Sequence, residues 1–262
     1  MSNESTKKTV LVTLGVCFVC SILVSTAAVT LRGIQRRNQE QEKLKNILIA
    51  GDLISGSEKL ESEKIEKIYQ GHIKAIIVDL RNGNILPDSL YTDQLNPDSY
   101  DIKSAVKDPD LSRDIEENDI AQIGRMPVYI VVYQVIESGE IQKIILPIFG
   151  KGLWSTMYGF IALSQNLKTV TGFTIYEHGE TPGLGGEVDN PQWKKLWIGK
   201  QAFDDNRAVR IEVIKGKTDP ADPETIYRVD GLSGSTLTTR GVDQMVKFWL
   251  GDQGYGPFLR QL

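Results

Sequence analysis

A cluster of hydroxyl residues lies near the C-terminal end of the 262-residue chain. Residues 230–239 read DGLSGSTLTT, and a segment with apolar residues at helical spacing follows them. The first turn of a helix presents unpaired N–H groups and the positive end of the helix dipole, and hydroxyls add further donors. Gly231 and Gly234 let another group approach the backbone closely. The spacing therefore predicts a site for an anion such as phosphate.

The same spacing leaves an alternative open. Thr238 or Thr239 can simply cap the helix, because threonine is a favoured N-cap residue. The segment lacks the lysine of a P-loop, and no neighbouring side chain is suited to act as a general base. Nucleotide hydrolysis is therefore not the chemistry we expect here.

A second segment, residues 176–186, reads YEHGETPGLGG, as expected of a tight irregular loop. Leu184 lies between glycines, and Glu180 and Thr181 precede it, so the loop offers the apolar surface and polar groups that a flat ring needs. His178 is either an acid–base group or a solvent-exposed loop residue. In a third segment, GKGLWSTMYG at 150–159, Trp154 can stack on an aromatic ligand or fill the core.

These three segments need a scaffold, which the apolar patterns predict. Residues 73–80 are expected to form a buried strand, and residues 128–136 and 141–149 a hairpin around the turn at 137–140. The predicted fold is α+β, with a largely antiparallel sheet and flanking helices. Further strands are expected at 159–163, 169–176, 209–213 and 224–229, helices within 39–71 and after residue 239, and mostly loop over 87–118.

An uncharged segment runs from Thr9 to Leu31. As a helix it would be about 34 Å long, enough to cross a membrane core of about 30 Å. A cleaved signal peptide is the alternative, although its apolar region is usually shorter, at about 7 to 15 residues. We therefore expect a tail and single transmembrane anchor at 1–35, a helical and loop-rich part at 36–125, and a binding domain at 126–262.

Composition narrows the possible functions. The net charge of −4 and the pI near 5.4 argue against nucleic-acid binding. Both cysteines, Cys17 and Cys20, lie in the apolar segment, which argues against a disulfide framework or a thiolate metal site in the rest of the chain. His72 and His178 are the only histidines, so we expect no metal site.

The three segments together resemble a known family. DGLSGST at 230–236 resembles the flavin-attachment motif of the FMN-binding domain that NqrC of the Na⁺-translocating NADH:quinone oxidoreductase (Nqr) shares with RnfG of the Rnf complex. GLWSTMYG at 152–159 and EHGETPGLG at 177–185 resemble the same family. The anchor, with Lys7 and Lys8 before it and STAAV at 25–29, is similar to the Nqr member of the family in particular.

The resemblance implies FMN attached through its phosphate to Thr236, by a separate flavin transferase. Ser235 stands where the family usually has alanine, and we expect it only to hydrogen-bond the phosphate. No catalytic residue is expected in this chain, which lacks a complete active site. The residues expected to contact FMN are Thr236, Ser233, Gly234, Ser235, Leu237 and Thr238, with Trp154, Ser155, Thr156, Glu180, Thr181, Gly183, Leu184 and Gly185.

The resemblance also implies a role and a location. The chain would relay electrons from NADH toward ubiquinone, coupled to Na⁺ export, among flavin and iron–sulfur subunits in the bacterial inner membrane. It places the domain in the periplasm, whereas the basic residues at 32–45 would place it in the cytoplasm by the positive-inside rule. The alternatives are an Rnf-type subunit, or a membrane-tethered ligand-binding or sensor domain without redox chemistry.

Overall fold

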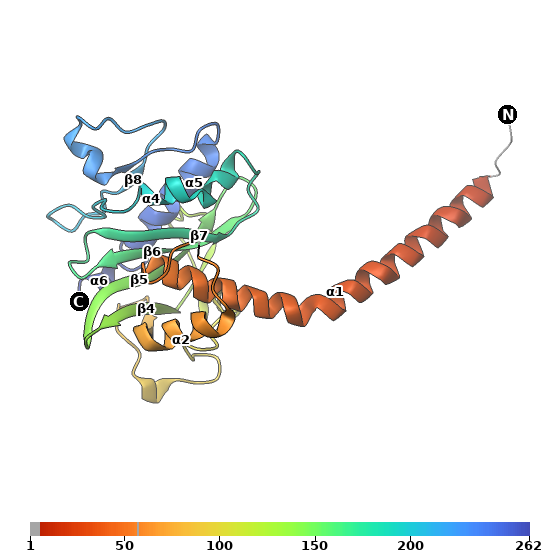
Figure 1. Ribbon diagram of the computed structural model, residues 1–262, viewed down its shortest axis with the longest axis horizontal. Coiled ribbons are helices and arrows are strands. Elements are labelled where there is room, and N and C mark those ends of the chain that lie inside the picture. Colours follow the sequence, from red (N-terminus) through yellow and green to blue (C-terminus); the bar gives the residue numbers. More distant parts are fainter. Residues whose placement is uncertain (1–5, 57) are drawn as a thin grey trace. The chain divides into compact units, whose positions relative to one another are not determined.

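The computed structural model describes residues 6–56 and 58–262. The chain divides into two units, one ending at Lys43 and a compact one comprising Leu44–Leu262. The first helix, α1 (Thr6–Ala50), contributes to both units (Figure 1). Its N-terminal part carries exposed apolar side chains, among them Leu14 and Phe18, which are 65% and 69% exposed. Of the helices in the described residues, α1 is the one long and apolar enough to cross a membrane.

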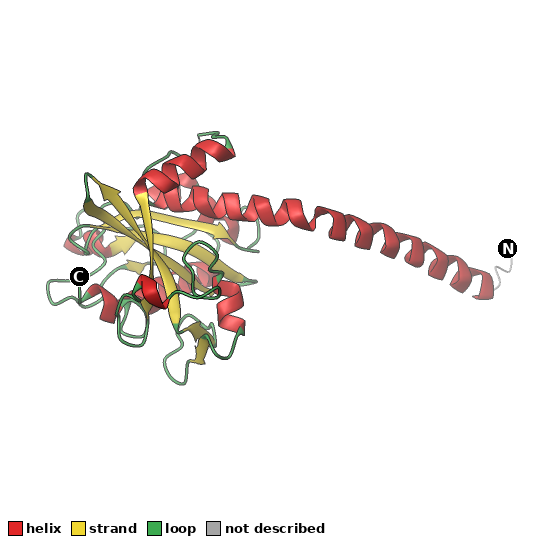
Figure 2. Ribbon diagram, turned by 90° about the horizontal axis from the view of Figure 1, so that it is seen from below, coloured by secondary structure: helices red, strands yellow, loops and turns green. Residues whose placement is uncertain are grey.

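A five-stranded antiparallel sheet forms the centre of the second unit (Figure 2). Its strands are β1 (Ile73–Asp79), β4 (Tyr129–Glu137), β5 (Glu140–Lys151), β6 (Thr156–Ser164) and β7 (Val170–Glu177), in the order β1-β4-β5-β6-β7. Ser138 and Gly139 connect β4 to β5 with φ of 52° and 86°. Positive φ at both central residues is typical of a two-residue hairpin turn. The predicted α+β fold with a largely antiparallel sheet is confirmed.

Helices cover both faces of this sheet. Ile145, Ala162 and Gly172 are directly paired across β5, β6 and β7, so they share one face. A Cβ on Gly172 would lie 2.0 Å from the carbonyl oxygen of Ala50, which places the end of α1 on that face. Gly150 faces the opposite side by strand alternation, and a Cβ there would lie 2.8 Å from the side chain of Met245. Met245 belongs to α5 (Thr236–Leu250), so α5 covers the second face.

Shorter elements complete the unit. The helix α2 (Ser62–His72) contacts β1 and β4, and α4 (Pro191–Lys195) contacts β7. The aromatic rings of Phe173 in β7 and Trp197 stack with centroids 3.9 Å apart. The other elements are η1 (Asp88–Leu90), α3 (Ile102–Lys107), β2 (Ser112–Asp114), β3 (Arg125–Pro127), η2 (Gly185–Asp189), β8 (Glu212–Val213), η3 (Pro223–Tyr227), β9 (Arg228–Val229) and α6 (Gly256–Leu259).

Four expectations from the sequence differ from the structure in whole or in part. The strand expected at 209–213 shrinks to β8, and the one at 224–229 is mostly the 3₁₀ helix η3, because Asp222 accepts from the Glu224 N–H and caps that helix. The loop expected at 87–118 contains α3, which Asp101 caps in the same way. β1 and β4 lie on opposite sides of the boundary proposed at residue 126, yet they pair in one sheet.

Candidate functional site

A buried carboxylate joins the three segments whose residues could do chemistry. Glu180 is 4% exposed and accepts hydrogen bonds from the backbone N–H groups of Leu153, Trp154 and Ser155, at 3.0 to 3.2 Å. It also accepts one from the Thr238 hydroxyl at 2.6 Å and one from the Ser155 hydroxyl at 3.3 Å. The loop after β5, the loop after β7 and the start of α5 therefore meet at one side chain.

The hydrogen bonds keep Glu180 charged. Burial alone raises the pKa of this carboxyl, because the charged form loses its hydration. The bonds from Thr238 and from the backbone of Trp154, Leu153 and Ser155 lower it by more, so the pKa of Glu180 lies below its ordinary value of 4.5. Glu180 is thus an anion at neutral pH and can only accept, and the Thr238 hydroxyl must donate to it.

Glycines permit this close packing. A Cβ on Gly152 would lie 2.5 Å from Glu180 Oε1, and one on Gly185 would lie 2.5 Å from Thr238 Oγ1. On α5, a Cβ on Gly241 would lie 2.4 Å from the carbonyl oxygen of Lys151. Contacts this short do not occur between a Cβ and backbone or buried oxygen atoms. Gly152, Gly185 and Gly241 are therefore required for the two loops to pack against each other and against α5.

The hydroxyl cluster separates into buried and exposed members at the start of α5. Ser235 and Thr238 are buried, and Ser235 Oγ donates to Thr238 Oγ1 at 3.0 Å, which continues to Glu180. Thr239 is also buried; its hydroxyl donates to the Ser235 carbonyl and accepts from the Leu232 N–H. Thr236, the first residue of α5, is exposed.

The capping alternative does not describe this helix start. Ser235 occupies the N-cap position but makes no capping hydrogen bond with its side chain, and Thr238 and Thr239 lie within the first turn. First-turn N–H groups without a capping side chain remain available to another acceptor. Gly234, at φ 72°, turns the chain into the helix and leaves Ser233 exposed beside it. The geometry offers an anion both backbone donors and an exposed hydroxyl.

Four exposed apolar side chains belong to the segments that meet at this helix start. Trp154 is 68% exposed, Leu237 53%, Leu184 46% and Leu153 41%. A Cβ on Gly234 would lie 3.3 Å from Leu184 Cδ2, so the loop after β7 touches the turn that precedes Thr236. Large apolar side chains grouped at the surface mark ligand or partner sites. We call these four residues the apolar rim.

The remaining predicted residues lie in the loops themselves. Ser155 Oγ accepts from the Gly179 N–H at 2.7 Å, which ties the loop after β5 to the loop after β7. Thr156 begins β6 and pairs with Lys151. Thr181 is exposed, and its carbonyl accepts hydrogen bonds from the N–H groups of Leu184 and Gly186. Gly183, at φ 75°, forms part of the turn that follows Thr181.

His178 has a role that the sequence did not indicate. Its Nδ1 accepts from the Glu180 N–H at 3.1 Å, so in the neutral ring Nε2 carries the proton and donates to Asp189 at 2.8 Å. Asp189 is also paired with Lys194 at 3.1 Å. The histidine orients the loop after β7, and it is neither a free acid–base group nor a solvated loop residue. The role of Glu180 was also missed, because spacing does not show which carboxylate folds inward.

Comparison with known proteins defines the class. The FMN-binding domain family matches residues 152–251, which contain the Glu180 network and the start of α5. The chain is 44% identical over its whole length to NqrC of the Na⁺-translocating NADH-quinone reductase of Pseudomonas aeruginosa, covering 97% of that protein. It is 43% identical to the Vibrio alginolyticus protein of the same description, again over all of this chain and 96% of the relative.

Solved structures of related proteins share this fold. The crystal structure of Shewanella oneidensis NqrC is similar with a TM-score of 0.76 and 32% identity, over 86% of this chain and 98% of that one. The structure of the corresponding Parabacteroides distasonis protein is similar with a TM-score of 0.65 and 27% identity, over 87% and 96%. The chain is therefore a protein of the FMN-binding-domain class. It belongs to the NqrC family, whose members are subunits of the Na⁺-translocating NADH-quinone reductase.

Proposed function

We propose that this chain carries FMN in a phosphoester bond to Thr236 and relays electrons from NADH toward ubiquinone within a Na⁺-exporting complex. The observation that supports the attachment site is the division of the hydroxyl cluster at the start of α5. Ser235 is buried and hydrogen-bonded to Thr238, whereas Thr236 is exposed at the first position of the helix. A transferase can reach the Thr236 hydroxyl without disturbing the bonds to Glu180.

The residues present fit FMN. The uncapped first turn of α5 offers N–H donors to the phosphate, and the exposed Ser233 offers a hydroxyl. The apolar rim supplies surface for a flat aromatic ring, with Trp154 as the largest member. Thr238, which we expected at the phosphate, donates to Glu180 instead and supports the site from below the surface. Ser235 supports the site indirectly as well, because its hydroxyl donates to the Thr238 hydroxyl.

Each part of the site has a separate task. A phosphoester leaves the ring without a covalent bond, so the protein must orient the ring with the apolar rim. FMN, when bound, supplies the reversible acceptance of electrons. The Glu180 network holds the loops after β5 and β7 against α5, so that the rim is formed before the ring arrives. A covalent tether keeps the flavin at a high effective concentration near successive partners.

The proposal extends to partners and location. The partners would be a flavin transferase for maturation and the other flavin and iron–sulfur subunits of the complex. We propose that α1 anchors the chain in the bacterial inner membrane with the second unit in the periplasm, against the positive-inside count. External protease applied to spheroplasts would digest a periplasmic unit, and protection of that unit from the protease would place it in the cytoplasm.

In-gel fluorescence tests the attachment. The chain is expressed with a flavin transferase, denatured, and separated by electrophoresis. A fluorescent band at the mass of the chain supports a covalent flavin, and a dark band refutes it. Thr236→Ala should abolish the fluorescence, whereas Ser235→Ala should retain it. The reverse result would move the attachment site to Ser235.

A further inference from the structure

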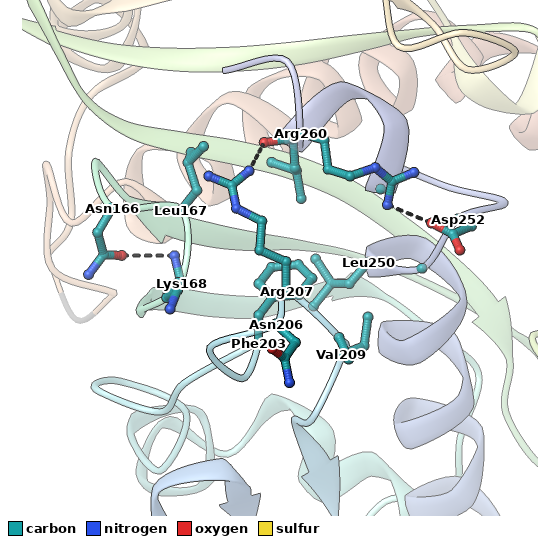
Figure 3. Close-up of a pocket in the computed structure, with 14 residues that line it drawn as sticks. Asn166, Leu167, Lys168, Phe203, Asn206, Arg207, Val209, Leu250, Asp252 and Arg260 are labelled. Atoms are coloured by element: carbon teal, nitrogen blue, oxygen red, sulfur yellow. Dashed lines mark hydrogen bonds and ion pairs between the residues drawn. The ribbon is translucent and has the colours of Figure 1, made fainter.

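A pocket lies at the opposite end of α5. Figure 3 shows a pocket of about 400 Å³ formed by residues 166–168, residues 203–209, the end of α5 and α6. Thr236 begins α5 and Leu250 ends it, and a helix of this length separates the two by about 21 Å. The pocket is therefore distinct from the proposed flavin site. Its volume falls within the range of about 300 to 1,000 Å³ that is typical of small-molecule sites.

The pocket combines apolar and charged residues. Its accessible apolar wall consists of Leu167, Ala208 and Val209, whereas Phe203, Leu250 and Leu259 are at most 8% exposed. Its charged residues are Lys168, Arg207 and Arg260, against one acid, Asp252. Lys168 and Arg260 are each paired with a carboxylate, so Arg207 is the cation that carries the argument.

The cations are available to a ligand. Figure 3 shows Arg207 directed at a backbone oxygen, where its Nη1 donates to the Leu259 carbonyl at 3.2 Å. In the described part of the chain no carboxylate pairs with Arg207, whose guanidinium has five N–H donors. Lys168 and Arg260 pair with Asp205 and Asp252, which are almost fully solvated, and such pairs open at little cost.

The backbone at the pocket is unusual. Leu167 and Arg207 adopt left-handed conformations, with φ of 59° and 62°. Residues with long side chains rarely occupy this region, and such strain is often found at ligand sites. Both strained residues line the same pocket and present their side chains from tight turns.

From this combination we infer that the pocket binds a small organic anion, with a carboxylate or phosphate group at Arg207 and a ring-sized apolar body against Leu167 and Val209. Arginine binds both anions through two parallel hydrogen bonds, which suits the free donors of Arg207. The apolar wall then buries the uncharged part of the ligand.

Binding of soluble probes tests the inference on the full chain in nanodiscs of zwitterionic lipid, with empty nanodiscs as the blank. The probes are 2-naphthoate, 2-naphthyl phosphate and the neutral 2-naphthamide, measured by titration calorimetry. Saturable binding of at least one anion, at least tenfold tighter than that of the amide, is expected. Equal affinity for the amide, or the absence of saturable binding of both anions, would overturn the inference.

Three variants locate the site. Arg207→Gln should weaken anion binding at least tenfold. Arg210→Gln should leave it unchanged, because Arg210 lies outside the pocket and pairs with Glu224. Ala208→Trp fills the mouth of the pocket from an exposed position and should abolish binding without disturbing the core. Unchanged binding in Ala208→Trp would place the anions elsewhere and refute the assignment, even if Arg207→Gln fails to fold.

Discussion

Replacing Glu180 by glutamine tests whether one buried carboxylate holds the proposed flavin site together. In the native protein Oε1 accepts from Trp154 and Ser155, and Oε2 accepts from Leu153 and Thr238. A glutamine of the same shape has one oxygen and one NH₂ group. Whichever way the amide turns, the NH₂ group faces at least one backbone N–H that needs an acceptor.

The magnitude follows from the bonds that are lost. A hydrogen bond to a charged group contributes about 1.5–3 kcal/mol, and a buried N–H left without an acceptor costs about 1–3 kcal/mol. The Thr238 hydroxyl can reverse and accept from the amide, so one face of the network partly recovers. We expect Glu180→Gln to lower the free energy of unfolding by about 2–4 kcal/mol.

Urea unfolding of the full chain, followed by tryptophan fluorescence, measures this loss. Glu177→Gln is the matched control, because Glu177 is exposed and pairs with Lys103 at the surface. It should change the free energy of unfolding by less than about 1 kcal/mol. A smaller fraction of the Glu180→Gln protein should carry covalently attached flavin, since the loops no longer hold the apolar rim beside Thr236. A loss of stability in Glu180→Gln no larger than in Glu177→Gln would refute the reasoning.

Three further predictions concern the same site. The pKa of Glu180 is lowered on folding, so its stabilising contribution is complete above the unfolded pKa of about 4.5 and disappears as the pH falls through the lower folded pKa. The stability gap between native and Glu180→Gln protein should therefore narrow in acid titrations below about pH 4. Gly185→Ala should lower the free energy of unfolding in urea by about 1–3 kcal/mol, because it forces a Cβ against Thr238. Gly71→Ala, at an open helical position, should raise it by about 0.5–1 kcal/mol. Equal effects of the two substitutions would contradict the close packing at Gly185. Trp154 is exposed, so Trp154→Ala should change the free energy of unfolding by less than about 0.5 kcal/mol and leave flavin attachment intact. It should shift the absorption spectrum of the flavin. An unchanged spectrum would show that Trp154 does not contact the flavin ring.

Much of the scaffold could be predicted from sequence because periodic patterns report which faces are buried. The two apolar runs at 128–136 and 141–149, with a turn between them, identify the β4–β5 hairpin directly. The spacing from Val242 to Leu250 identifies α5 in the same way. Short elements were less predictable, since η3 depends on a capping contact by Asp222 and β8 on a distant parallel partner.

The sequence singled out the three segments that meet in the structure, but it did not show what each residue in them does. The three segments could be identified from glycine and hydroxyl content and from resemblance, and the structure brings them together. Which hydroxyl faces outward depends on the direction of each side chain at the helix start, and no pattern distinguishes Ser235 from Thr236 in that respect. The inward turn of Glu180 likewise depends on three backbone N–H groups from a loop 25 to 27 residues away.

Peptide mapping of the flavin-loaded chain tests the central claim most directly. Trypsin cleaves after Arg228 and Arg240 and releases residues 229–240 as one peptide that contains every hydroxyl of the cluster. A phosphoester predicts that this peptide gains the mass of one FMN less one water, and fragmentation should place the gain on Thr236. The gain on Ser235 or Ser233, or an unmodified peptide from protein that retains its flavin after denaturation, would contradict the account.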